Sequence, residues 1–174
     1  MIKIAIVGAG NAGCVTALHF QKYLSEKTDK FEIDIYHSPH YHPIEKVGQG
    51  TTIPVPKLIS SVLDINWYHN PIGATIKTGI LYENWGKKND KIFHSFEIPN
   101  ASMHFVPKKL SECVIESKLF NVIEKVINEA EEDIDADIIF DCRGRHNRDH
   151  SKYDTLINPL NSVLLSVKYE RDID

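Results

Sequence analysis

The sequence predicts an α/β fold, in which helices cover a parallel sheet. The first observation is a strand, helix and strand in succession: apolar runs at residues 2–7 and 31–36 flank residues 11–24, whose apolar positions have helical spacing. The second is the run ADIIFDC at residues 136–142, whose continuous apolar centre is typical of a buried parallel strand. Together they indicate one α/β domain or part of one.

The helix at residues 11–24 should lie with one face on the sheet. The polar turn SEKTDK at residues 25–30 separates it from the second strand. Apolar residues recur at three- and four-residue spacings, which places them on one helical face. The residues that we expect to cover the sheet are Ala12, Val15, Thr16, Phe20 and Tyr23.

The middle of the chain alternates loops with short elements. Residues 37–57 are rich in proline, histidine and glycine, which indicates a loop. A short helix is expected near residues 58–63, and strands are expected at residues 74–86 and 91–99.

The next segment contains one helix and one ambiguous element. Pro107 can open a helix in which Leu110, Cys113 and Val114 share a face. The apolar positions of residues 119–130 suit a helix, while their β-branched side chains suit a strand, so both interpretations stay open.

Composition excludes several classes of protein. The 174 residues carry 20 Lys and Arg against 24 Asp and Glu, a net charge of −4, with no basic block, so nucleic acid is not an expected partner. Cys14, Cys113 and Cys142 lack CxxC spacing, which argues against a disulfide framework and a structural zinc site and favours a reducing compartment. No apolar run approaches about 18 residues, and a signal peptide is not recognisable, so we expect a cytoplasmic protein outside the membrane.

The segment IAIVGAGNAG predicts a dinucleotide site. Gly8, Gly10 and Gly13 have GxGxxG spacing directly after a strand and directly before a helix. The first glycine permits the tight turn, the second lets a pyrophosphate approach the backbone, and the third lets helix and strand pack closely. The acidic residue expected at the end of the second strand, for the ribose hydroxyls, is replaced by His37, which can hydrogen-bond a hydroxyl but is not a carboxylate.

The stretch HSPHYHP, residues 37–43, has three histidines within six residues. A metal site is one interpretation, but no clustered carboxylate or fourth ligand stands at a recognisable spacing. A loop that touches a cofactor or solvent is the preferred interpretation, and we predict no metal ligands.

Lys77 lies inside the strand predicted at residues 74–86, close to the Gly73-Ala74 pair. One interpretation is a lysine whose stem covers apolar surface while its ammonium stays in water. The other is a functional amine, with small neighbouring residues that let another backbone come close.

Five blocks of the sequence, read in order, resemble the N-terminal motifs of flavin-dependent tryptophan halogenases. Their order, spacing and character agree with that family across roughly residues 2–145. The blocks are IVGAGNAG, SPHYHPIEKVGQGTT, GATIKTGILYENWG with FHSF just after, MHFVPKKL, and ADIIFDCRGR.

The resemblance implies a Rossmann-like FAD-binding domain of the flavin-monooxygenase type, incomplete relative to the family. It implies that a flavin hydroperoxide, made from reduced flavin and oxygen, oxidises chloride or bromide, and that the resulting hypohalous acid passes to Lys77 for halogenation of an indole-like aromatic. A separate flavin reductase would be a partner. The implied FAD contacts are Gly8, Gly10, Gly13 and His37, then Gly48, Gln49, Gly50 and Thr51 of a GxGxxT loop, and later Asp141 and Gly144.

We therefore expect residues 1–174 to form a single partial FAD-binding domain. Its parts are a βαβ dinucleotide-binding unit at residues 1–36, a cofactor and halide loop at 37–57, lysine-bearing strands at 74–100, and a later FAD-contacting strand at 136–145.

The sequence also departs from the family pattern. Besides His37, Gln49 replaces the acidic residue of the GxGxxT loop, and the WxWxIP signature and the later part that supplies a catalytic glutamate are absent. An N-terminal fragment and a natural truncated relative both fit. The alternatives to a halogenase are a non-halogenating module that binds flavin or nucleotide, and a flavin-dependent hydroxylase; the oligomeric state is open.

Overall fold

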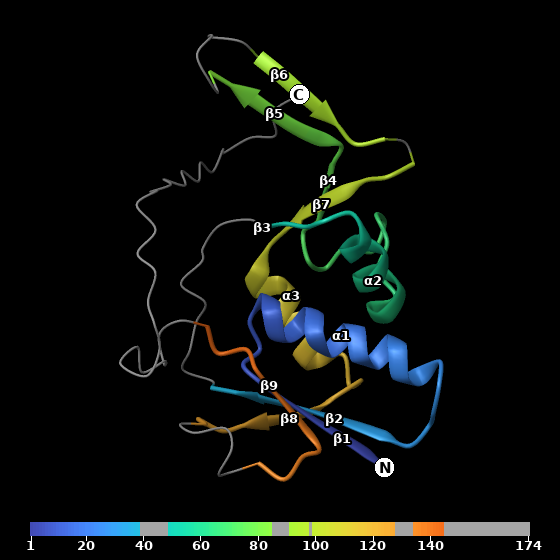
Figure 1. Cartoon of the computed structure of the whole chain (residues 1–174), viewed down its shortest axis with the longest axis vertical. Coiled ribbons are helices and arrows are strands. Elements are labelled where there is room, and N and C mark those ends of the chain that lie inside the picture. Colours follow the sequence, from blue (N-terminus) through green and yellow to red (C-terminus); the bar gives the residue numbers. More distant parts are fainter. Residues whose placement is uncertain (39–48, 85–90, 98, 128–133, 145–174) are drawn as a thin grey trace.

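The computed structural model covers residues 1–174 and describes residues 1–38, 49–84, 91–97, 99–127 and 134–144. These residues form an α/β fold, as predicted (Figure 1). A parallel sheet lies at one end of the molecule, helices pack above it, and two small antiparallel sheets lie beyond the helices.

The parallel sheet contains both strands of the predicted βαβ unit. Its spatial order is β8-β2-β1-β9, and every neighbouring pair is parallel. Within the ambiguous residues 119–130, Asn121–Glu124 form a strand, and residues 128–130 lie outside the described residues. The strands are β1 (Ile2–Val7), β2 (Phe31–His37), β8 (Asn121–Glu124) and β9 (Ile138–Asp141).

Burial is greatest at the centre of this sheet. Ile4 to Val7 of β1 are all buried, so both faces of the central strand are covered. The strand β9 is parallel, as predicted, but the expectation that it is fully buried is wrong, since Ile138 is 44% exposed. The reason is position: β9 pairs with β1 on one side and is an edge strand among the described residues.

The helix α1 (Asn11–Ser25) packs on the sheet, as predicted, but with a different face. Its buried residues are Gly13, Cys14, Ala17, Leu18 and Leu24, whereas Ala12 and Tyr23 of the predicted face are exposed. Close packing of helix on strand needs small side chains, so Gly13 and Ala17 lie at the contact. The predicted face was chosen from larger apolar residues and therefore left them out. The other predicted residues, Val15, Thr16 and Phe20, are half-buried and line a shallow hollow with α2 and β9.

Two shorter helices pack against α1: the first lies on its side away from the sheet, and the second crosses behind it in Figure 1. The first, α2 (Pro54–Leu63), begins earlier than predicted, with proline in its first turn, where no intrahelical donor is lost. The second, α3 (Pro107–Glu116), begins at the predicted proline and buries Leu110 and Val114, with Cys113 half-buried.

The predicted strand at residues 74–86 is two strands that belong to different sheets. The strand β4 (Thr75–Lys77) pairs with β7 (Ser102–Phe105), while β5 (Gly79–Glu83) pairs with β6 (Lys91–Ser95) in an antiparallel hairpin. The strand β7 also pairs with β3 (Gln49–Gly50), so the order of the second sheet is β3-β7-β4.

The break between β4 and β5 places Lys77 last in its strand. Gly79 opens the next strand, β5, and a Cβ there would lie 2.5 Å from the backbone oxygen of His94. The close backbone approach expected beside Gly73 and Ala74 therefore occurs at Gly79. Gly73 has a different constraint, a φ of +61°.

Candidate functional site

The GAGNAG turn is held by two close backbone contacts. Gly8 has a φ of +108°, and a Cβ there would lie 2.8 Å from the oxygen of Cys142 in the loop after β9. A Cβ on Gly13 would lie 1.8 Å from the oxygen of Gly8. These two glycines therefore allow strand, turn and helix to meet, as the motif predicts.

Gly10 has a different environment. A Cβ on it would meet no atom of the described residues within 4 Å. Gly10 is the N-cap of α1 and provides no side-chain cap, and the first turn of the helix has no acidic residue. The free N–H groups of this 15-residue helix thus remain for an anion, and the helix dipole favours negative charge there.

One polar atom beside this turn lacks a partner. The side-chain oxygen of Asn11, the first residue of α1, is buried and accepts no hydrogen bond from the described residues. A buried acceptor of this kind is normally satisfied. The open space at Gly10 and the uncapped helix fit the pyrophosphate of a dinucleotide, and the Asn11 oxygen fits a donor group of the same ligand.

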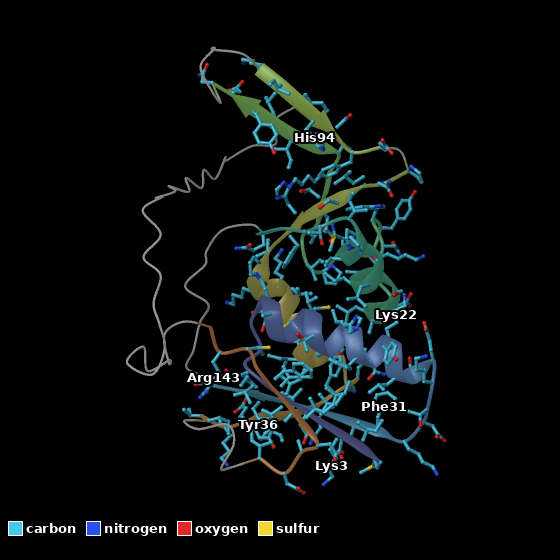
Figure 2. All side chains as sticks on the ribbon, viewed as in Figure 1. Lys3, Lys22, Phe31, Tyr36, His94 and Arg143 are labelled. Atoms are coloured by element: carbon cyan, nitrogen blue, oxygen red, sulfur yellow. The ribbon has the colours of Figure 1, made fainter. Side chains whose placement is uncertain are left out.

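The carboxyl ends of the parallel strands lie around the same turn, which is where ligands bind in open α/β sheets. In Figure 2, Tyr36 and Arg143 mark this edge, and Phe31 marks the opposite end of β2. His37 ends β2 and is the register partner of Glu124, which ends β8. Their side chains approach to 3.9 Å between Nε2 of His37 and Oε1 of Glu124.

The segment after β9 is fixed by an arginine. Arg143 donates from Nε to Oδ1 of Asp141 at 2.9 Å, from Nη2 to Oδ2 at 2.8 Å, and from Nη1 to the oxygen of Ile127 at 2.7 Å. The hydrogen bond to Asp141 is the main reason that the pKa of Arg143 is raised. Gly144 follows with a φ of +79°, so the two predicted residues of this block flank the turn at Arg143.

A second group of predicted residues meets on the β3-β7-β4 sheet. Lys77 and Gly50 come from strands on either side of β7, where Gly50 pairs with His104 and Lys77 pairs with Ser102. A Cβ on Gly50 would lie 3.4 Å from Nζ of Lys77 and 3.3 Å from the imidazole of His104. Lys77 is half-buried, and its Nζ lies 5.8 Å from the ring centre of Phe96.

Thr51 is attached to the same sheet by a buried serine. The Ser102 side chain is almost inaccessible; its hydroxyl lies 2.9 Å from Oγ1 of Thr51 and also donates to the Thr51 carbonyl. The backbone N–H of Met103 donates to Oγ1 of Thr51 at 3.1 Å. These bonds fix the chain just after Gly50, beside the lysine.

The predicted site residues therefore form two groups. Gly8, Gly10, Gly13, His37, Asp141 and Gly144 lie at the carboxyl edge of the parallel sheet, and Gln49, Gly50, Thr51 and Lys77 lie on the second sheet. Gly48 falls outside the described residues, as do His40 and His42 of the histidine-rich stretch.

Sequence reasoning missed Glu124, Ser102 and His104. His104 lies inside the quoted block MHFVPKKL, but no spacing rule singles it out, and the other two are identified only by strand pairing. Among the described ranges, no group of three His, Cys, Asp or Glu side chains could hold a metal ion. Within those same ranges, none of the helices has the length and apolar character to cross a membrane.

Comparison with known proteins gives a family and a fold. The family model described as tryptophan halogenase matches residues 3–110. An uncharacterised protein from Sinorhizobium fredii is 27% identical over 96 residues, which is 54% of this chain and 18% of that protein.

Solved structures of flavin-dependent halogenases have the same fold. A tryptophan 6-halogenase from Streptomyces toxytricini superposes with a TM-score of 0.67 at 17% identity, covering 83% of this chain and 42% of the other. A flavin-dependent halogenase from Xanthomonas campestris gives 0.63 at 18% identity, covering 82% and 42%. The chain thus spans less than half the length of these structures and about a fifth of the curated relative.

Proposed function

Because the chain belongs to the tryptophan halogenase family, we propose that it is the FAD-binding part of a flavin-dependent halogenase and supplies the lysine that directs the halogen. The observation that carries the proposal is the position of Lys77. Lys77 is half-buried at the end of β4, and its Nζ lies next to Gly50, where a Cβ would be 3.4 Å away.

FAD fits the residues at the GAGNAG turn. Gly10 leaves room for the pyrophosphate, the first turn of α1 offers N–H donors, and Asn11 offers a buried acceptor. We assign Gly8, Gly10 and Gly13 to FAD binding. When bound and reduced, FAD would supply, with oxygen, the oxidation of chloride or bromide.

Two further groups of residues belong to the proposal. Gly48, Gln49, Gly50 and Thr51, within the loop at residues 37–57, would lie beside the flavin and the halide. Asp141 and Gly144, within residues 136–145, would contact FAD at the end of β9. The βαβ unit at 1–36 and the strands at 74–100 complete the proposed division of residues 1–174.

Lys77 would act on hypohalous acid in one of two ways. As an ammonium, it donates a hydrogen bond to the oxygen of the acid, which makes the halogen more electrophilic. As an amine, it attacks the halogen: a nitrogen–halogen bond forms, the oxygen–halogen bond breaks, and the amine proton leaves with hydroxide as water. Either course delivers the halogen from a fixed position to an electron-rich ring.

The remaining components are also proposals. The substrate would be an indole or another electron-rich aromatic, and a separate flavin reductase would supply reduced flavin. The glutamate that assists at the substrate in this family would come from a C-terminal portion, so residues 1–174 alone should bind FAD and yield no halogenated product.

The test uses the protein encoded by the complete reading frame that contains residues 1–174. Supplied with FAD, a flavin reductase, NADH, oxygen and bromide, it should brominate an indole, detected by the bromine isotope pattern of the product. Lys77→Ala should abolish bromination while NADH oxidation continues. Lys91→Ala, a matched control on the exposed hairpin, should retain it.

Three outcomes distinguish the alternatives. Bromination that persists in Lys77→Ala contradicts the role of the lysine. An oxygenated product without bromine indicates a hydroxylase, and FAD binding without any product indicates a non-halogenating module.

A further inference from the structure

The carboxyl edge of the parallel sheet has a carboxylate one strand away from the position that the dinucleotide motif predicts. His37 ends β2, where an acidic residue is expected, and Glu124 ends the neighbouring β8 as its register partner. The His37 side chain is 15% exposed and the Glu124 side chain 66% exposed, so the imidazole is largely covered while the Glu124 side chain is open to solvent.

The chemistry of a ribose explains why the carboxylate matters. Its two neighbouring hydroxyls both donate hydrogen bonds, and a carboxylate can accept both. A neutral imidazole has a single acceptor nitrogen, so His37 alone cannot replace a carboxylate.

The geometry allows Glu124 to take this place. Parallel strands lie about 4.8 Å apart, and residues in register project from the same face of the sheet. The backbone N–H of Lys125 donates to the His37 oxygen at 3.0 Å, so the pairing of β2 with β8 continues to the ends of both strands. Oε1 of Glu124 consequently lies 3.9 Å from His37 Nε2, too far for a direct hydrogen bond and close enough for one hydroxyl to contact both groups.

Asp141, which ends β9, is held differently. Both of its carboxylate oxygens accept hydrogen bonds from the Arg143 guanidinium. This leaves Glu124 as the better candidate to receive ribose hydroxyls.

We propose that Glu124, together with His37, binds the adenosine ribose of FAD in place of the carboxylate that the motif expects at the end of β2. This rests on the proposed function, because it assumes that the GAGNAG turn binds FAD. Glu124 accepts from the ribose hydroxyls, and the imidazole of His37 supplies a further hydrogen bond beside it.

The experiment is a titration of the 174-residue chain with FAD and with an FAD analogue whose adenosine ribose lacks the 2′-hydroxyl. Glu124→Gln should weaken FAD binding about tenfold or more, the usual effect of losing a hydrogen bond to a charged group. The wild type should bind the analogue more weakly than FAD, and Glu124→Gln should bind the two about equally. Glu83→Gln, which removes a carboxylate from the distant hairpin, should match the wild type.

A second variant tests the position of the carboxylate. In the double variant Glu124→Gln with His37→Glu, a carboxylate returns at the end of β2, so FAD affinity should recover together with discrimination against the analogue. A residue with a purely structural role would not be replaced in this way.

The results distinguish a failure of the ribose assignment from a failure of the proposed function. If the wild type binds FAD but does not distinguish the analogue, or if Glu124→Gln binds FAD as tightly as the wild type, the ribose assignment is wrong. If the folded wild type binds no FAD, the proposed function fails first and the ribose assignment fails with it. The comparison of two ligands on the wild type needs no variant, so it stands even if a variant does not fold.

Discussion

Alanine and valine substitutions in the GAGNAG turn should separate the glycines that the fold needs from the one that the ligand needs. A methyl group on Gly13 would lie 1.8 Å from the Gly8 oxygen, and one on Gly8 would lie 2.8 Å from the Cys142 oxygen. A methyl group on Gly10 meets nothing within 4 Å among the described residues. The φ of −75° and ψ of −174° at Gly10 are accessible to any residue.

The magnitudes follow from these contacts. Cβ atoms essentially never approach other atoms within 3.0 Å, so Gly13→Ala must move α1 away from the turn by roughly an ångström or more. Overpacking of this kind costs about 3 kcal/mol, which lowers Tm by roughly 10 °C for a domain of this size. Gly10→Val should change the stability by less than about 1 kcal/mol.

FAD binding should depend on Gly10, although Gly10 contributes little to stability. The valine side chain at Gly10 keeps a pyrophosphate from the helix N-terminus, and one lost hydrogen bond to a charged group weakens FAD binding by about tenfold or more. The assay is thermal unfolding followed by circular dichroism, paired with FAD titration followed by quenching of flavin fluorescence. Unchanged FAD affinity in Gly10→Val would refute the assignment of the turn to pyrophosphate, and an unchanged Tm in Gly13→Ala would refute the packing argument.

Three further predictions concern stability. Ser102→Ala leaves groups of Thr51 without a buried partner and should cost about 1–3 kcal/mol in urea denaturation; a change below about 0.5 kcal/mol would contradict this. Burial raises the pKa of Cys14 from 9.0 to about 12, so the unfolded chain ionises first and the free energy of unfolding should fall as pH rises above 9, by roughly 1.4 kcal/mol at pH 10. Cys14→Ala should lack this fall. An equal fall in the free energy of unfolding of the wild type and of Cys14→Ala would contradict the prediction. Gly79→Ala places a Cβ 2.5 Å from the His94 oxygen and should disrupt the hairpin, seen as lost cross-strand contacts by NMR; an intact hairpin would show that the backbone adjusts easily.

The parts of the molecule that local sequence determines were predicted well. The GAGNAG turn, the two strands beside it and the helix that begins at Pro107 each depend on neighbours within a few residues, and periodicity and turn chemistry report such neighbours. Gly13 shows where local patterns stop being sufficient. The glycine motif that contains it was recognised, but the buried face of α1 on which it lies was predicted wrongly.

The partners of β7 and β8, which lie far apart in the sequence, were not predicted. Gly50 and Lys77 meet because both of their strands pair with β7, and the sequence pattern of a strand does not name its partner. Glu124 was missed for the same reason, since β2 and β8 are joined across 87 residues at Asp34 and Asn121. The strand at residues 74–86 was predicted as one element because a break between two sheets leaves little trace in the alternation of side chains.

The order β8-β2-β1-β9 has a consequence for synthesis on the ribosome. β1 is made first, yet its partner β9 follows about 130 residues later, as the bonds between Lys3 and Asp137 across 134 residues show. At about 5–20 residues per second, one edge of β1 waits roughly 7 to 27 seconds for its neighbour. An unpaired edge of an apolar strand can pair with another chain during that interval. Nascent chains should therefore engage chaperones through residues 2–7 until β9 has emerged.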